Sequence, residues 1–168
     1  LKDINTASAA LGFGMSLSLA VYLVFNKEGL KFPQAICTCY VVCTCFTSFG
    51  YMLSPLGGYE SFLCSGAKTA NRASDNALCG IQAVLVQFFG LAALLFWFGI
   101  VHNLHMTAHR LESIATRRKL MKYFLFLPLI GSLCSVVVLA SLGKLGVAFT
   151  GTSCWITNDD SGLHVWLW

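Results

Sequence analysis

The sequence predicts an all-α fold, a polytopic bundle of transmembrane helices. Of its 168 residues, 57% are hydrophobic and 11% are charged, and the mean hydropathy is +0.72. A soluble domain of this size carries about 25% charged residues. In addition, four segments reach the ~20-residue length needed to cross a hydrocarbon core of about 30 Å, and none of them contains Lys, Arg, Asp or Glu. These observations indicate that residues 1–168 belong to one membrane domain.

The four expected spans cover residues 7–25, 35–53, 78–101 and 123–142. Small residues run through the first span, which suits close packing of helices in lipid. In the third span, Gln82 and Gln87 are the only large polar side chains, and we expect them to hydrogen-bond neighbouring helices. The last residues, 163–168, have the composition of the start of a fifth span.

The second span contains "CTCYVVCTCF", in which Cys37, Cys39, Cys43 and Cys45 have the spacing of a thiolate metal cluster. Helix geometry argues against such a cluster. At about 100° per residue, Cys39 and Cys43 share a face, whereas Cys37 and Cys45 lie on other faces and about 12 Å apart along the axis. Four sulfurs of one helix cannot surround one zinc ion at about 2.3 Å. We therefore interpret these cysteines as small apolar packing residues, and we expect no cofactor.

Charge predicts the orientation of the spans. Two of the three connections between spans hold seven of the eleven Lys and Arg residues, namely Lys27, Lys31, Arg110, Arg117, Arg118, Lys119 and Lys122. By the positive-inside rule, these connections are cytoplasmic and the N-terminus is extracellular, which is the topology of a multi-pass plasma-membrane protein. The run "RRKLMK" could be a nucleic-acid patch, but between two spans it is better explained as an orientation signal that contacts lipid headgroups. No nucleic-acid partner is expected.

Three cysteines fall on the extracellular side in this orientation, where disulfides persist. Cys79 begins the third span, Cys154 follows the fourth, and Cys64 lies between the second and third. A bridge between Cys79 and Cys154 would tie the segment after the fourth span to the head of the third. The third cysteine of such a set is either free or paired outside this chain, and Cys64 competes for the same partner.

Catalytic signals are weak. His102, His105 and His109 share a helical face, a layout that resembles membrane desaturases and hydrolases, but only Glu112 is nearby and no second His-rich segment follows. No G-x-S-x-G, phosphate-binding loop or H-E-x-x-H motif occurs. The absence of charged residues in the spans also disfavours ion transport. We expect that the protein is not an enzyme and that these histidines form a hydrated helix end.

The arrangement described above is common to seven-helix receptors, and the local sequence resembles the Frizzled/Smoothened family. The stretch "LKFPQAICTCYVVCTCFTSFGYM" is similar to that family at Lys31, Phe32, Pro33, Cys39, Tyr40, Ser48, Gly50 and Tyr51. Further matches extend the resemblance over almost the whole chain, at Glu60, Cys64, Cys79, Phe89, Gly90, Ala92, Trp97, Pro128 and the stretch "LGVAFTGTSCW". Departures at Gln34, Ala35 and Phe96 indicate a divergent member.

The resemblance implies a fragment of a seven-transmembrane receptor that covers helices one to four and the second extracellular loop. It implies an extracellular ligand and cytoplasmic G proteins or Dishevelled-like adaptors as partners, in addition to the lipid bilayer. It also assigns Cys64 a partner upstream of Leu1, which leaves Cys79 to pair with Cys154, and it makes Gly90, Trp97 and Pro128 helix-packing positions. Slime-mould cAMP-type or secretin-type receptors, whose second outer loop resembles "CWITND", and a four-pass structural or adaptor protein are the alternatives.

Overall fold

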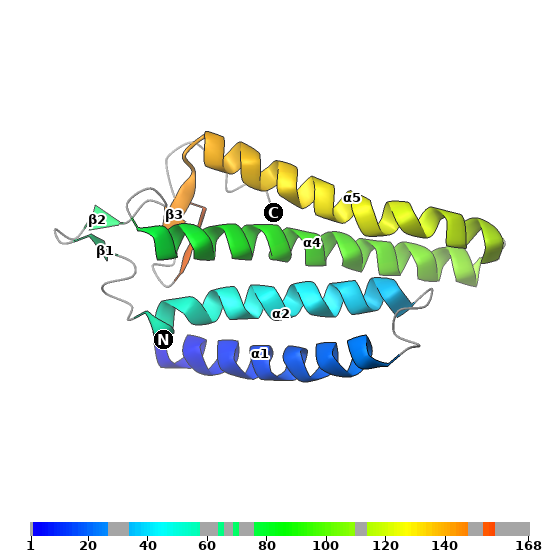
Figure 1. Ribbon diagram of the computed structural model, residues 1–168, viewed down its shortest axis with the longest axis horizontal. Coiled ribbons are helices and arrows are strands. Elements are labelled where there is room, and N and C mark those ends of the chain that lie inside the picture. Colours follow the sequence, from blue (N-terminus) through cyan, green and yellow to red (C-terminus); the bar gives the residue numbers. More distant parts are fainter. Residues whose placement is uncertain are drawn as a thin grey trace.

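Four long helices make up most of this computed structural model (Figure 1). It describes residues 2–26, 34–57, 64–65, 69–70, 76–109, 114–147 and 153–156. The helices are α1 (Lys2–Phe25), α2 (Gln34–Leu56), α4 (Ala77–Ala108) and α5 (Ile114–Ser141). Each is long and apolar enough to cross a membrane, so the expected all-α transmembrane bundle is confirmed.

The helices lie side by side in chain order, with α2 packed against both α1 and α4, and α4 also packed against α5. The N-terminal end of α1 lies at the same end of the bundle as the strands (Figure 1). We call this the ribbon end. The last residues of α1 and the first of α2 lie at the opposite end, as do the last residues of α4 and the first of α5.

Two short antiparallel strand pairs occupy the ribbon end. Strand β1 (Cys64–Ser65) pairs with β2 (Thr69–Ala70), and β3 (Leu145–Val147) pairs with β4 (Cys154–Ile156). In the second pair, which we call the ribbon, Leu145 lies opposite Ile156, and Val147 lies opposite Cys154.

A glycine turn leads directly from α5 into the ribbon. Gly143 has a φ of 63°, a left-handed conformation that costs glycine little. Its N–H donates to the carbonyl of Ala140, and the N–H of Lys144 donates to the carbonyl of Leu139, each over 3.0 Å. This pair of hydrogen bonds is a Schellman motif. It ends α5 abruptly and fixes where β3 begins.

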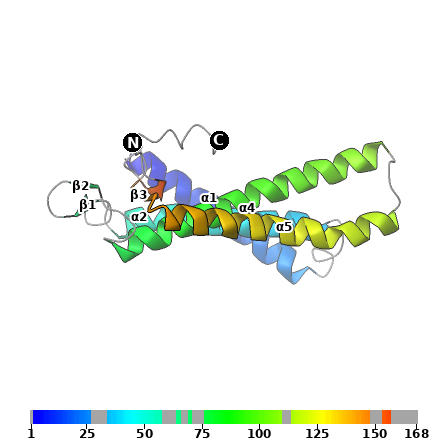
Figure 2. The same cartoon turned by 90° about the horizontal axis from the view of Figure 1, so that it is seen from above.

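The helices extend beyond the spans expected from hydropathy. The third span was expected to end at residue 101, but α4 continues to Ala108, and α5 begins nine residues before the expected start of the fourth span. No Gly or Pro interrupts either extension, so the polar residues there continue the helix. With 32 residues, α4 is about 48 Å long, and α4 and α5 reach farther than α1 and α2 at the opposite end (Figure 2). The expected fifth span at 163–168 lies outside the described residues.

Buried apolar side chains form two clusters along α4. One cluster, at the ribbon end, joins α4, α5 and the ribbon through Cys79, Ala83, Leu139, Leu145, Cys154 and Ile156. The second joins α2 and α4 through Ile36, Cys43, Ala92 and Phe96. Large apolar side chains also cover the outside of the bundle, for example Met15, Phe25 and Leu127, as expected for helices surrounded by lipid.

Candidate functional site at the ribbon end

The ribbon is joined to α4 by a disulfide between Cys79 and Cys154. Their sulfurs are 2.08 Å apart and both residues are fully buried. Cys79 lies in the first turn of α4. The helix begins there because the Asn76 side chain accepts a hydrogen bond from the N–H of Leu78 over 3.0 Å, which is a common way to cap the start of a helix. The bridge expected for Cys79 and Cys154 is therefore present. The third cysteine, Cys64, begins β1, and its side chain lies outside the described part of the structure.

The buried amide of Gln82 connects α4 to α2 and to the ribbon at the same time. Its Nε2 donates to the carbonyl of Gly50 over 2.9 Å and to Oγ of Ser54 over 2.8 Å. Its Oε1 accepts from the backbone N–H of Cys154 over 2.7 Å, and the Ser54 hydroxyl lies 3.0 Å from the same oxygen. An amide has two donors and two acceptor sites. All four are used here, which permits Gln82 to be fully buried.

A second buried amide, that of Gln87, connects α4 to α5 and to the ribbon. Its Nε2 donates to Oγ of Ser135 over 2.8 Å, and its Oε1 accepts from the indole Nε1 of Trp155 over 2.6 Å. An indole N–H can only donate, so the amide oxygen must face Trp155 and the nitrogen must face α5.

Both glutamines thus direct the amide oxygen toward the ribbon and the nitrogen toward a neighbouring helix. Five residues correspond to about 140° of net rotation around a helix, which is why Gln82 faces α2 and Gln87 faces α5. The two amides and the disulfide attach β4 to α4, and the amides link it through α4 to α2 and α5. We call Gln82, Gln87, the disulfide and their partners Ser54, Ser135 and Trp155 the ribbon clamp.

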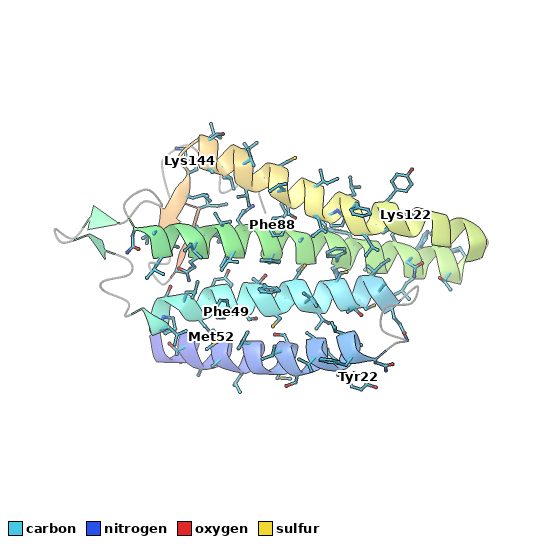
Figure 3. All side chains as sticks on the ribbon, in the orientation of Figure 1. Tyr22, Phe49, Met52, Phe88, Lys122 and Lys144 are labelled. Atoms are coloured by element: carbon cyan, nitrogen blue, oxygen red, sulfur yellow. A yellow bond between two sulfur atoms is a disulfide. The ribbon has the colours of Figure 1, made fainter. Side chains whose placement is uncertain are left out.

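Of the seven basic residues expected on the cytoplasmic side, the four that the structure describes belong to α5, toward the end of the molecule opposite the ribbon. Arg117, Arg118 and Lys119 lie in the first turns of α5, although their side chains are outside the described part. Lys122 is exposed and lies on α5 far from Lys144, which is beside the ribbon (Figure 3). The remaining three positions, Lys27, Lys31 and Arg110, fall outside the described residues.

The three expected packing positions differ in their surroundings. Pro128 is buried inside α5, and its carbonyl accepts from the Ser132 hydroxyl over 2.7 Å. Trp97 is half exposed, with its ring 5.9 Å from that of Tyr40. Gly90 is not a close contact, since an added Cβ would lie 3.8 Å from its nearest neighbour.

Gly50 is a close contact between α2 and α4. A Cβ there would lie 3.0 Å from a methyl carbon of Val86, so the two helices pack tightly beside the Gly50 carbonyl that binds Gln82.

The histidines and the second-helix cysteines do not assemble a metal centre among the described residues, where no three His, Cys, Asp or Glu side chains gather closely enough. The rings of His105 and His109 are tilted against each other with centroids 4.5 Å apart, and the ring of His102 lies 5.5 Å from that of Phe124. Of the four cysteines, Cys43 and Cys45 are buried, whereas Cys37 is exposed. Cys43 belongs to the apolar cluster between α2 and α4, and Cys39, one turn earlier on the same face, packs against that cluster.

Sequence reasoning identified both glutamines but missed their partners. Ser54 and Ser135 carry no sequence signal beyond being polar groups in apolar segments. The sequence does contain the pattern that brings Trp155 to Gln87, because Trp155 follows the bridged Cys154. A tryptophan next to a cysteine that is fixed to the head of a helix must lie near the first turns of that helix.

Comparisons with known proteins identify the family to which the chain belongs. The model of the Frizzled/Smoothened family membrane region matches residues 3–167. Frizzled-5 of Xenopus laevis is 25% identical over 144 residues, which are 85% of this chain and 25% of that protein. Frizzled-5 of Danio rerio is 29% identical over 84 residues, 48% of this chain and 14% of that protein.

A relative from Dictyostelium discoideum, "Frizzled/smoothened-like sans CRD protein A", is 29% identical over 109 residues. That alignment covers 65% of this chain and 19% of the relative. The chain therefore spans a quarter or less of the length of these curated relatives.

Proposed function

This chain belongs to the Frizzled/Smoothened family, and we propose that it forms part of the membrane region of a signalling receptor. In this proposal, the receptor converts an extracellular signal into a rearrangement of helices, which G proteins or Dishevelled-like adaptors read in the cytoplasm. The observation that carries the proposal is the family match over nearly the whole chain, from α1 to beyond the ribbon.

Features at the two ends of the molecule support separate roles, one in receiving the signal and the other in contacting cytoplasmic partners. At the ribbon end, one disulfide and two buried amides attach a small β-structure to α4, and the same amides bind α2 and α5, so a ligand that contacts it would act directly on α4 and indirectly on the other two helices. At the opposite end, α4 and α5 project beyond the other helices, and the first turns of α5 are basic. The positive-inside rule assigns that basic end to the cytoplasm of a plasma-membrane protein, and hence the N-terminus and the ribbon to the outside.

The proposal is tested in cells that express the full-length protein containing this chain, by energy transfer to tagged Gα subunits and to a tagged Dishevelled-like adaptor. The paired substitution Arg117→Ala and Arg118→Ala removes two charges from the basic end. Because charges at an interface speed the encounter with a partner of complementary charge, the transfer signal should fall. The paired substitution Arg117→Lys and Arg118→Lys, which keeps both charges, is the matched control and leaves the signal unchanged.

Surface labelling accompanies both variants, because the substituted arginines also contribute to membrane orientation. A wild-type protein that reaches the cell surface and yet gives no transfer signal with either partner would overturn the proposal. That result would favour the alternative of a structural or adaptor protein. We further propose that the receptor has no catalytic activity of its own. A measured activity that His105→Ala abolishes would contradict this.

A further inference from the structure

We propose that Gln87 is a positioning residue that couples the ribbon to α5, so that a displacement of the ribbon changes how α5 is held against α4. The inference deepens the proposed receptor function and rests on it for its biological meaning. Its physical basis is a single buried amide that is shared between Trp155 on the ribbon and Ser135 on α5.

The sharing follows from the hydrogen-bond geometry. Trp155 donates to Oε1 over 2.6 Å, and Nε2 donates to Ser135 over 2.8 Å. The side chain of Gln87 is 5% exposed, so water cannot easily replace either partner. A buried polar group that loses its partner is destabilised far more than an exposed one. A shift of Trp155 therefore requires Gln87 to follow it, at the expense of the bond to Ser135, or to remain and lose Trp155.

The amide of Gln82 does not have this role to the same degree. Its partner on the ribbon is the N–H of Cys154, and the same residue is already joined covalently to Cys79. Cys154 is therefore held against α4 whether or not Gln82 is present. No covalent bond holds the indole of Trp155 to Gln87, so this contact can open while the disulfide stays intact.

Apolar packing also links the ribbon to α5, because Leu139 belongs to the same buried cluster as Leu145 and Ile156. Such packing tolerates small shifts, whereas a hydrogen bond weakens steeply when its angle changes. Ser135 lies one helical turn before Leu139. Through the Gln87 amide, a displacement of the ribbon therefore reaches α5 at Ser135, one turn farther from the ribbon than Leu139. Unlike the apolar contacts, this hydrogen bond is either made or broken.

Hydrogen exchange of the ribbon amides tests the coupling in the full-length protein in lipid nanodiscs. Ser135→Ala removes the acceptor on α5 and so loosens the amide that holds Trp155. We expect the amides of residues 154–156 to exchange about threefold faster or more. Ser132→Ala is the matched control: Ser132 is buried on the same helix, but its hydroxyl donates to the Pro128 carbonyl of its own helix. It should change the exchange of the ribbon less than twofold.

The decisive step repeats Ser135→Ala in a Gln87→Leu background. In that background, Ser135→Ala should not change the exchange of the ribbon amides any further, because the amide that connects Ser135 to Trp155 is absent. If Gln87→Leu fails to fold, Trp155→Phe replaces it as the background, since it removes only the indole donor. Equal effects of Ser135→Ala and Ser132→Ala, or an effect of Ser135→Ala that persists in the background variant, would overturn the proposal. The measurement needs no ligand or cytoplasmic partner, so its failure is distinguishable from a failure of the receptor function.

Discussion

The two buried glutamines show how single side chains can hold several elements together within a membrane. Gln82 has a fully buried amide with partners on α2 and on the ribbon. Lipid offers no replacement partners for a buried amide.

The substitution Gln82→Met, which keeps the side chain's length, leaves the N–H of Cys154 without an acceptor, and should lower the free energy of unfolding by about 2–3 kcal/mol. Thermal unfolding in detergent, followed by the reaction of the buried Cys43 and Cys45 thiols, would measure the loss. Gln34→Met, at an exposed glutamine, is the control, and an equally large effect there would contradict the explanation.

The disulfide is a second feature at the scale of single residues. It closes a separation of 75 residues, which in the entropic model stabilises the folded chain by about 4 kcal/mol. Cys154→Ser should therefore lower the unfolding temperature markedly, whereas Cys134→Ser, at an exposed free cysteine, should not.

Peptide mapping without reductant checks the pairing itself. It should recover a fragment that links Cys79 to Cys154. A link from Cys64 to either of these two cysteines would show that the assignment is wrong.

At the scale of elements, the close contact of α2 with α4 depends on Gly50, because a glycine has no Cβ to keep the two helices apart. Gly50→Ala would bring a Cβ to 3.0 Å from Val86 and 3.5 Å from Leu85. The helices must then separate, which strains the bond from Gln82 to the Gly50 carbonyl. We expect a loss of about 1–3 kcal/mol in unfolding free energy. The double substitution Gly50→Ala with Val86→Ala should lose less than the sum of the single effects. Gly14→Ala is the matched control in α1, since nothing lies within 4 Å of its added Cβ, and it should be neutral or slightly stabilising.

The cysteine-rich helix leads to a second prediction about an element. Replacement of Cys37, Cys39, Cys43 and Cys45 by Ala should cost packing energy, chiefly at the two buried positions, and should leave the metal content of the purified protein at background. Elemental analysis of the wild type and the fourfold variant checks this. Stoichiometric zinc in the wild type that disappears in the variant would restore the metal-site interpretation.

At the scale of the whole molecule, the prediction concerns which end faces the cytoplasm. The charge distribution assigns residue 117 to the inside and residue 60 to the outside. In intact cells, a membrane-impermeant maleimide should label Glu60→Cys and should label Arg117→Cys only after the membrane is permeabilised. Labelling of Arg117→Cys from outside would reverse the orientation, and the proposed roles of the two ends would be reversed with it.

The sequence by itself determined the membrane class and the four spans, and it predicted that Cys64, Cys79 and Cys154 lie on one side of the membrane. These features depend on local properties, because the length of an apolar segment and the place of a cysteine beside it can be read without knowing any partner. Which two of the three cysteines pair was implied only by the resemblance to the Frizzled/Smoothened family. The sequence predicted the ends of the helices less accurately. The expected spans stop where charged residues begin, whereas α4 and α5 continue as regular helices into polar sequence, since hydropathy reports the membrane boundary and not the backbone conformation.

Only the tertiary structure decided which groups the buried amides meet. The partners of Gln82 lie 28, 32 and 72 residues away, and those of Gln87 lie 48 and 68 residues away. Their identity depends on how far each helix is rotated and shifted against the next. The same is true of Gly50, which packs more closely than Gly90, although both stand in apolar helices. Rotation and shift arise from the packing of four helices and a ribbon together, and no segment of the chain encodes them alone.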